Sequence, residues 1–187
     1  MDKLGLNVAK EDLIMTRKHL KDDAKNIHCW QYRQWLLRNF DLWGKSEWEY
    51  VEELISEDEF NNSAWNQRAF LLQHAMQKEP GVQERDLQWT TSWILNCSKG
   101  GNESAWNYLL YLTLDFQQLP DEKDDTWLNL KCKFGPWDES GDSLYIRYML
   151  LSGGIEDSAG IRKACRLLNA LAPMQKCFWD SLSSTIN

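Results

Sequence analysis

The side chains that most often perform catalysis or hold metals are few and scattered in this sequence of 187 residues. Its three histidines are far apart, and its five cysteines show neither the spacing of a zinc site nor that of a disulfide framework. His28 and Cys29 are adjacent, but neighbouring helical residues point about 100° apart, which disfavours a cysteine–histidine catalytic pair. No glycine-rich phosphate loop is present. The sequence thus offers no complete catalytic constellation of its own.

The most regular pattern is instead a recurrence of Asn, Trp and Arg. The stretches "NIHCWQYR" and "NNSAWNQR" both place Trp four residues after Asn and Arg three residues after Trp. A third copy, "NESAWNYL", has Leu109 where the arginine would stand. The repeated residues are Asn26, Trp30 and Arg33, then Asn61, Trp65 and Arg68, then Asn102 and Trp106.

Each residue type in this pattern has a structural role at its position. An Asn just before a helix can accept a hydrogen bond from a backbone N–H of the first turn. The Trp then faces inward, and the Arg three residues later shares its face. Because a buried arginine needs an acceptor, we expect Arg33 and Arg68 to join neighbouring hairpins through a carboxylate or carbonyl partner. Leu109 predicts that the third layer is sealed by apolar contact.

The elements that carry these residues have helical periodicity nearly throughout, and no strand-like alternation exceeds four residues. Short joints containing Gly, Pro, Asn or Asp predict that successive helices are antiparallel hairpins. We expect helices at about 9–20, 27–40, 45–57, 62–77, 82–97, 103–117, 121–131, 142–152, 157–171 and 173–183.

The spacing of the copies predicts an all-α, superhelical (solenoid) array of antiparallel αα-hairpins. Trp30 and Trp65 are 35 residues apart, and Trp65 and Trp106 are 41 apart, which are periods typical of two-helix repeats. We expect one helical-repeat domain over 1–187, with an exposed loop at "FGPWDESGD". Its predicted parts are repeats at about 22–57, 58–97 and 98–131 and a C-terminal cap at about 142–187.

Composition narrows the class of protein. Hydrophobic residues make up 43% of the chain and eleven residues are Trp, so many large rings must be buried. The net charge of −7 disfavours nucleic acid as a partner, and no apolar run is long enough to span a membrane. The polar start "MDKLGLNVAKED" does not read as a signal peptide. We expect a cytoplasmic protein with five reduced, mostly buried thiols.

Together, "DAKNIHCWQYRQW", "NNSAWNQR" and "NESAWNYL" resemble the repeats of protein prenyltransferase alpha subunits. They look most like the alpha subunit shared by protein farnesyltransferase and type I geranylgeranyltransferase. The resemblance is strong from about residue 10 to 117 and weaker to the end. The alpha subunit of Rab geranylgeranyltransferase is an alternative, and so is a noncatalytic helical-repeat scaffold for protein–protein interaction.

This resemblance implies a heterodimeric enzyme in which the alpha subunit wraps around a beta subunit. The beta subunit would carry the zinc, with magnesium also expected in the complex, and this chain would hold no metal or other cofactor. The complex would transfer a farnesyl or geranylgeranyl group from its diphosphate to a cysteine of CaaX-type protein substrates. We expect this chain to be inactive without the beta subunit.

The resemblance also implies which residues of this chain would reach the active site. The family's Asn-Tyr-His stretch matches Asn26, Ile27 and His28, which makes them candidate substrate-binding residues and His28 the candidate catalytic residue. Ile27 stands where Tyr is usual, so a hydroxyl donor is lost. The family's catalytic lysine lies one repeat earlier, and nothing before Lys25 matches its motif. A fragment, a short gene model and a compact variant are the alternatives for this difference.

Overall fold

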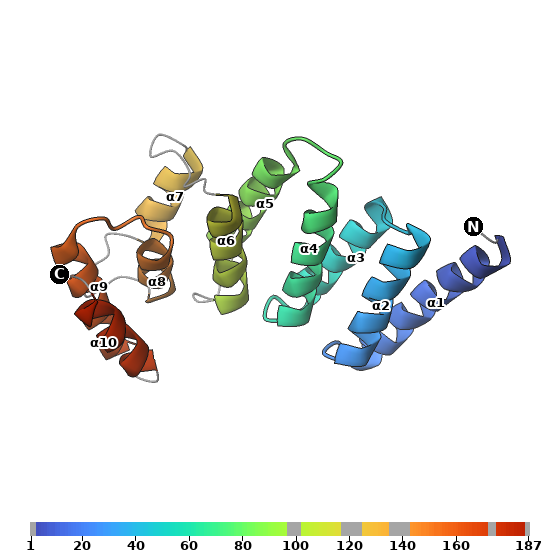
Figure 1. Ribbon diagram of the computed structural model, residues 1–187, viewed down its shortest axis with the longest axis horizontal. Helices are drawn as coiled ribbons and strands as arrows, with labels where there is room; N and C mark the ends of the chain where they lie inside the picture. Colours follow the sequence, from blue (N-terminus) through green and yellow to red (C-terminus); the bar gives the residue numbers. More distant parts are fainter. Residues whose placement is uncertain (1–2, 97–101, 117–124, 135–142, 172–174, 186–187) are drawn as a thin grey trace. The chain divides into compact units, whose positions relative to one another are not determined.

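The computed structural model describes residues 3–96, 102–116, 125–134, 143–171 and 175–185, and all secondary-structure elements in these ranges are helices (Figure 1). The contacts between residues divide the chain into two units, 1–80 and 81–187. Within the described ranges, none of the helices combines the length and apolar character that a membrane crossing requires.

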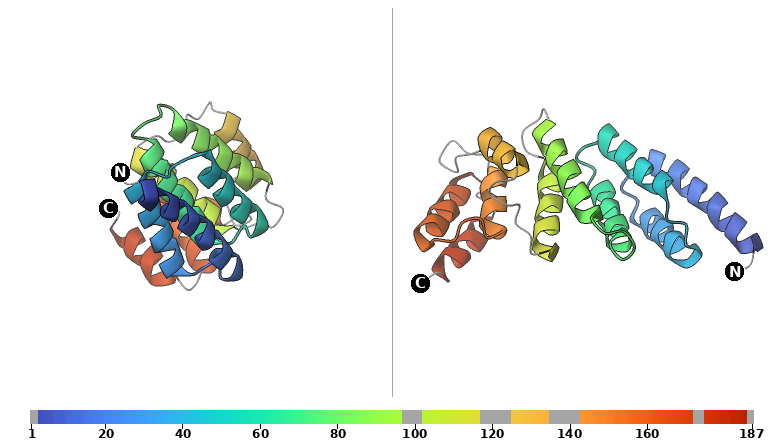
Figure 2. Two further views of the ribbon diagram at one scale, coloured as in Figure 1. Left: turned by 90° about the vertical axis from the view of Figure 1, so that its right-hand side faces the viewer. Right: turned by 90° about the horizontal axis from the view of Figure 1, so that it is seen from above.

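The N-terminal unit consists of two antiparallel hairpins. Its helices are α1 (Lys3–Asp22), α2 (Ile27–Phe40), α3 (Lys45–Glu57) and α4 (Asn62–Ala75). Helix α1 packs most closely against α2, and α3 packs most closely against α4 (Figure 2). The loops inside both hairpins are short, which forces the chain to reverse direction between the paired helices.

Apolar side chains at helical spacing form the core of this unit. The larger apolar residues that lose all or nearly all contact with solvent are Leu20, Leu36, Leu37, Val51, Ile55, Trp65, Leu71 and Leu72. They come from all four helices, so each helix buries one stripe against the others. Helix α2 ends where Asp41 adopts a left-handed conformation (φ 51°) and its N–H bonds to the carbonyl of Leu37.

The C-terminal unit contains the other six helices. They are α5 (Val82–Asn96), α6 (Glu103–Phe116), α7 (Asp125–Phe134), α8 (Ser143–Leu151), α9 (Ser158–Leu171) and α10 (Lys176–Ser184). Helix α5 packs on α6 and α7, α6 packs on α8, and α9 packs on α8 and α10. Trp106 of α6 is buried among the rings of Phe134, Tyr145 and Tyr148, and Trp179 of α10 is also buried.

Most helices lie close to the predicted ranges, with one clear extension. Helix α1 starts at Lys3 rather than at residue 9, because Leu6 continues the helical spacing of Ala9, Leu13, Thr16 and Leu20 towards the N-terminus. Over the first six helices, the closest pairs are α1–α2, α3–α4 and α5–α6. The predicted repeats instead pair α2 with α3, α4 with α5 and α6 with α7, so their boundaries are shifted by one helix. Both divisions describe the same array, because a series of helices can be divided into pairs starting at either helix. Most of the predicted loop "FGPWDESGD" lies outside the described residues.

The cysteines correct one expectation. Of the four that the structure describes, Cys165 is buried and Cys29 is half-buried, whereas Cys132 and Cys177 are exposed. The expectation of mostly buried thiols is therefore wrong for Cys132 and Cys177. Both occupy the solvent-facing side of a helix with a single apolar stripe, where a small thiol is tolerated without burial.

Candidate functional site

The starts of α2 and α4 have the same local geometry. The Asn26 Oδ1 accepts a hydrogen bond from the N–H of Cys29 (3.0 Å), and the Asn61 Oδ1 accepts from the N–H of Ala64 (3.3 Å). The indole N–H of the following Trp then donates to a carbonyl of the preceding loop at 2.9 Å in both hairpins. Asn and Trp therefore act together: the cap begins the helix and the indole fastens the loop to it.

The third copy of the pattern begins its helix in the same way. The Asn102 Oδ1 accepts from the backbone N–H groups of Ser104 (3.1 Å) and Ala105 (3.2 Å), and Trp106 is buried. Leu109 is fully buried at the position where the first two copies have Arg. An apolar side chain thus occupies this inward position in α6.

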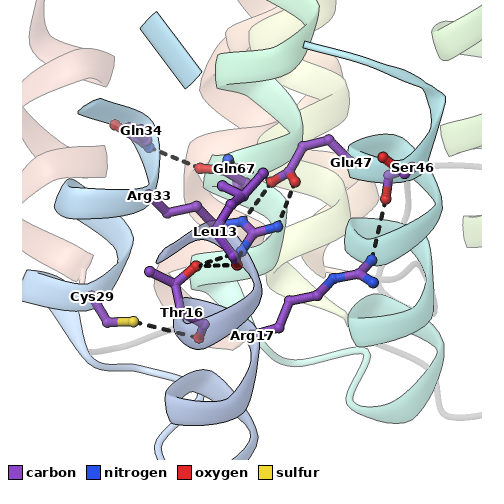
Figure 3. Close-up of polar contacts among 9 residues, drawn as sticks. All are labelled: Leu13, Thr16, Arg17, Cys29, Arg33, Gln34, Ser46, Glu47 and Gln67. Atoms are coloured by element: carbon purple, nitrogen blue, oxygen red, sulfur yellow. Dashed lines mark hydrogen bonds and ion pairs between the residues drawn. The ribbon is translucent and has the colours of Figure 1, made fainter. Parts of the chain in front are cut away.

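Arg33 is the centre of a buried polar network in the N-terminal unit (Figure 3). Its guanidinium donates to both carboxylate oxygens of Glu47, with Nε–Oε1 at 2.7 Å and Nη2–Oε2 at 2.5 Å. The Nη1 atom donates to the carbonyl of Leu13 (2.9 Å) and to the Oγ1 of Thr16 (2.6 Å). Arg33 of α2 thereby joins α1 and α3, which connects the first hairpin to the second.

Amide side chains extend this network to α4. The Gln67 Nε2 donates to the Glu47 Oε1 (3.3 Å), and the Gln34 Nε2 donates to the Gln67 Oε1 (3.0 Å; Figure 3). The repeated Asn, Trp and Arg residues of the sequence do not point to Glu47 or Gln67. A signal for Glu47 was available, because it lies one helical turn before Tyr50 and Val51 on the apolar stripe of α3, where an acid requires a basic partner.

Tyr50 contributes an aromatic surface to the same region. The Cζ atoms of Arg17 and Arg33 lie 4.1 and 4.5 Å from the centroid of its ring, so two guanidinium groups contact one phenol. Burial raises the pKa of Tyr50 to about 12, which keeps the phenol neutral at physiological pH. Arg17 also donates to the carbonyl of Ser46 at 3.2 Å, which adds a second connection between α1 and the start of α3.

The second repeated arginine has a different partner. Arg68 of α4 forms an ion pair with Glu52 of α3 at 3.1 Å, and its Cζ lies 5.1 Å from the ring of Trp48. The two arginines share a position in the pattern, and each pairs with a glutamate of α3, Arg33 with Glu47 and Arg68 with Glu52.

The residues implied by the family resemblance lie together at the start of α2 and face solvent. Ile27 is 62% exposed, His28 is exposed, and Asn26 is half-buried because its side chain caps the helix. The first turn of α2 contains no acidic residue, so its free N–H groups and the positive end of the helix dipole are not neutralised by a side chain of that turn. Such an end is suited to an anion, with His28 as an additional donor.

These residues are separate from the cavity that the structure shows in the same unit. That cavity has a volume of about 340 Å³ and lies between α1 and α3. Its α1 side carries the basic residues Arg17, Lys18 and Lys21, and its α3 side carries acidic residues. Among the residues described, no three His, Cys, Asp or Glu side chains are grouped to hold a metal ion.

The chain is similar to a family of repeats and to several known proteins. The family model described as "protein prenyltransferase alpha subunit repeat" matches residues 9–40 and 45–75, which correspond to α1–α2 and α3–α4. The geranylgeranyl transferase type-2 subunit alpha of Saccharomyces cerevisiae is 31% identical over 110 residues, which are 54% of this chain and 34% of that protein.

Two plant proteins match over a shorter segment. The protein farnesyltransferase/geranylgeranyltransferase type-1 subunits alpha of Pisum sativum and Arabidopsis thaliana are 39% and 40% identical over 73 residues. The matched segment is 38% of this chain in both comparisons, and 21% and 22% of the plant proteins. The chain thus matches about a third or less of the length of these curated relatives.

The fold has a counterpart among solved structures. One chain of the structure "Candida albicans protein geranylgeranyltransferase-I complexed with GGPP" superposes with a TM-score of 0.80 at 25% sequence identity. The superposition covers 95% of this chain and 59% of that chain. The similarity therefore includes the C-terminal helices, where the repeat pattern of the sequence is weak.

Proposed function

Since this chain carries prenyltransferase alpha-subunit repeats and is homologous to prenyltransferase alpha subunits, we propose that it is the alpha subunit of a heterodimeric protein prenyltransferase. The enzyme would transfer farnesyl or geranylgeranyl from its diphosphate to a cysteine near the C-terminus of CaaX-type substrate proteins. A beta subunit would supply the zinc site and the isoprenoid pocket, and magnesium would act in the complex. The complex would work in the cytoplasm.

The observation that supports this proposal most directly is the exposed start of α2. Ile27 and His28 face solvent next to the Asn26 cap, although the adjoining Trp30 is buried. The hairpin thus fixes the backbone at this edge while leaving two side chains available to another molecule. A partner that brings an isoprenoid diphosphate to this edge would meet a histidine and a helix N-terminus without acidic residues.

The role proposed for His28 follows from the charge that develops during the reaction. As the bond between isoprenoid and diphosphate breaks, negative charge grows on the leaving group and is stabilised by fixed donors. His28 would donate one hydrogen bond to that group. Ile27 cannot donate a hydrogen bond, so the stabilisation at this edge would be weaker than with the Tyr that the resemblance implies at this position.

The test is co-expression of the full chain with a prenyltransferase beta subunit, followed by size-exclusion chromatography with light scattering. We expect a 1:1 complex that transfers the isoprenoid to a CaaX peptide. Within the complex, His28→Ala should lower kcat by about tenfold or more through the lost hydrogen bond. Gln31→Ala, also exposed on α2, is the matched control and should leave kcat unchanged. Equal kcat values for the wild-type and His28→Ala complexes would limit His28 to packing against the partner.

A second candidate is the alpha subunit of a type-2 (Rab) geranylgeranyltransferase. The match to the yeast type-2 subunit extends over 110 residues, compared with 73 for the plant type-1 subunits. Co-expression with a type-1 and a type-2 beta subunit in the same cells distinguishes the two, because the preferred partner is retained in the complex. A chain that remains alone in the presence of both would instead favour the noncatalytic helical-repeat scaffold.

A further inference from the structure

The cavity between α1 and α3 has walls of opposite charge. Its volume of about 340 Å³ lies in the range of small-molecule sites. Arg17, Lys18 and Lys21 line it from α1, and Glu53 and Glu57 line it from α3. Both helices belong to the N-terminal unit, so the cavity lies within one unit of the chain. A molecule in this cavity therefore meets cations on one side and anions on the other.

The charges of the two walls are not neutralised by neighbouring side chains. Among the described residues, neither the lysines of the α1 wall nor the glutamates of the α3 wall form an ion pair. Arg17 donates to the carbonyl of Ser46, which is a neutral acceptor (Figure 3). Because the two walls do not pair with each other, both signs of charge are available to a ligand.

Tyr50 provides a second and independent indication of a ligand. It lines the same cavity and is 6% exposed, and its buried hydroxyl has no hydrogen-bond partner among the residues that the structure describes. Buried polar groups normally have such a partner. The Cζ of Arg17 lies 4.1 Å from the centroid of the Tyr50 ring, so a cation adjoins the phenol. An unused O–H donor beside a guanidinium suits an anionic acceptor such as a carboxylate.

The cavity also offers apolar contact. Leu20 of α1 and Leu54 of α3 line it and are buried, and Ala24 of the following loop lines it as well. A ligand that fills this space removes apolar surface from water. The cavity thus combines an anion-binding wall with an unused donor, a cation-binding wall and apolar side chains.

We propose that this cavity binds a small zwitterion of the amino-acid or dipeptide type, with a carboxylate and an ammonium group at opposite ends of an apolar body. The carboxylate accepts from Tyr50 and pairs with Arg17 and Lys21. The ammonium group pairs with Glu53 or Glu57, and the apolar body contacts the leucines. The inference goes beyond prenyl transfer and does not depend on it.

The probe is the dipeptide leucyl-leucine, titrated into the ¹⁵N-labelled full chain and followed by amide chemical shifts. We expect saturable binding with a Kd of roughly 0.1–1 mM, the range typical of a ligand of this size. The shifts should be concentrated in the ranges 17–24 and 50–58, which contribute the lining residues. The N-acetylated dipeptide lacks the ammonium group and the C-terminal amide lacks the carboxylate, so each should bind about fivefold or more weakly.

Three variants assign the contacts. Lys21→Glu reverses one charge of the α1 wall at an exposed position and should raise the Kd about fivefold or more. Lys25→Glu makes the same charge change at an exposed residue that does not line the cavity, and as the matched control it should leave the Kd unchanged. Tyr50→Phe keeps the ring and removes only the donor, so it should raise the Kd for leucyl-leucine about threefold and affect the C-terminal amide much less.

Four results would overturn the inference. Binding that does not saturate over the millimolar range is one, and shifts concentrated outside the two lining ranges are another. Equal affinity for leucyl-leucine and both blocked forms would reduce the cavity to apolar contact. Equal effects of Lys21→Glu and Lys25→Glu would assign the binding to the general charge of the surface. These measurements use the chain's own amides, so their failure is distinguishable from a failure of the proposed prenyl transfer.

Discussion

At the scale of single residues, the stability of the N-terminal unit depends on a buried ion pair. The side chains of Arg33 and Glu47 are each 2% exposed, and their bidentate pair joins two hairpins. Removing one partner leaves the other as an unpaired buried charge, whereas replacing both with apolar residues restores a compatible pair. The energetic role of Arg33 is therefore tied to Glu47.

We predict that Arg33→Met lowers the free energy of unfolding by about 3–5 kcal/mol, because the Glu47 carboxylate remains buried without its partner. The double variant Arg33→Met/Glu47→Met should recover most of this loss. Urea unfolding followed by circular dichroism measures both. The control is Lys45→Met, which removes an exposed ion pair with Glu49 and should fall within error of the wild type. A double variant that is less stable than Arg33→Met would contradict the prediction.

A second prediction at this scale concerns pH. The ring of His74 stacks on Trp43 at 3.7 Å between centroids, and its buried Nε2 has no hydrogen-bond partner among the residues that the structure describes. Burial, assisted by the nearby Lys78, lowers the pKa of His74 below its ordinary value of 6.5. His74 therefore takes up a proton more readily in the unfolded chain than in the folded chain. The stability that neutral His74 contributes to the folded chain is complete above pH 6.5 and is lost as the pH falls towards the folded-state pKa.

His74→Phe keeps an aromatic ring against Trp43 and removes the titration. We expect the free energy of unfolding of the wild type, relative to this variant, to be constant between about pH 7 and 8 and to decrease towards about pH 5. Urea unfolding at several pH values gives the difference. A difference that stays constant over the whole range would show that His74 has the same pKa in the folded and unfolded chains.

At the scale of elements, the start of a helix depends on which residue occupies the N-cap position. Asn61 is buried and caps α4 through the N–H groups of Ser63 and Ala64, whereas the next residue, Asn62, is exposed inside the first turn. Two neighbouring residues of the same type thus have unequal roles, and a pair of matched substitutions separates them.

We predict that Asn61→Ala destabilises the chain by about 0.5–2 kcal/mol, because two backbone donors of the first turn of α4 lose their acceptor. Asn61→Asp keeps an acceptor and should cost less. Asn62→Ala is the control and should have little effect, since alanine favours helix. Chemical denaturation compares the three variants. Equal losses for Asn61→Ala and Asn62→Ala would mean that capping is not the source of the effect.

At the scale of the whole molecule, the contacts divide the chain into the units 1–80 and 81–187. In helical arrays each hairpin is stabilised mainly by its nearest neighbours, so stability is distributed along the chain. The core of the N-terminal unit combines aliphatic side chains with Trp30, Tyr50, Trp65 and Phe70 around the Arg33 network. The C-terminal unit surrounds Trp106 with aromatic rings.

We therefore predict that a destabilising change in one unit acts mainly in that unit. Arg33→Met should accelerate hydrogen exchange in α1–α4 by about tenfold or more and change α8–α10 much less. Leu168→Ala, which removes a buried side chain of α9, should show the opposite distribution. Uniform acceleration over all helices in both variants would indicate a single cooperative unit instead.

Much of the fold could be predicted from sequence because its signals are local. The apolar period of the helices, the Asn before each repeated Trp and the 35-residue spacing all act within one or two helical turns or one repeat. The same holds for the candidate residues Asn26, Ile27 and His28, whose position at a helix start follows from the cap. The predicted start of α1 was late, although Leu6 lies at helical spacing from Ala9 and Leu13.

The tertiary structure alone decided the partners and the exposed faces. Arg33 required an acceptor, but only the packing of the two hairpins shows that Glu47 of α3 supplies it together with Thr16 of α1. Likewise, Trp35 and Phe70 occupy equivalent positions in the sequence, yet one is half exposed and the other is buried. Side-chain type is encoded locally, whereas burial depends on whether a second hairpin lies against that face, which is a property of the fold.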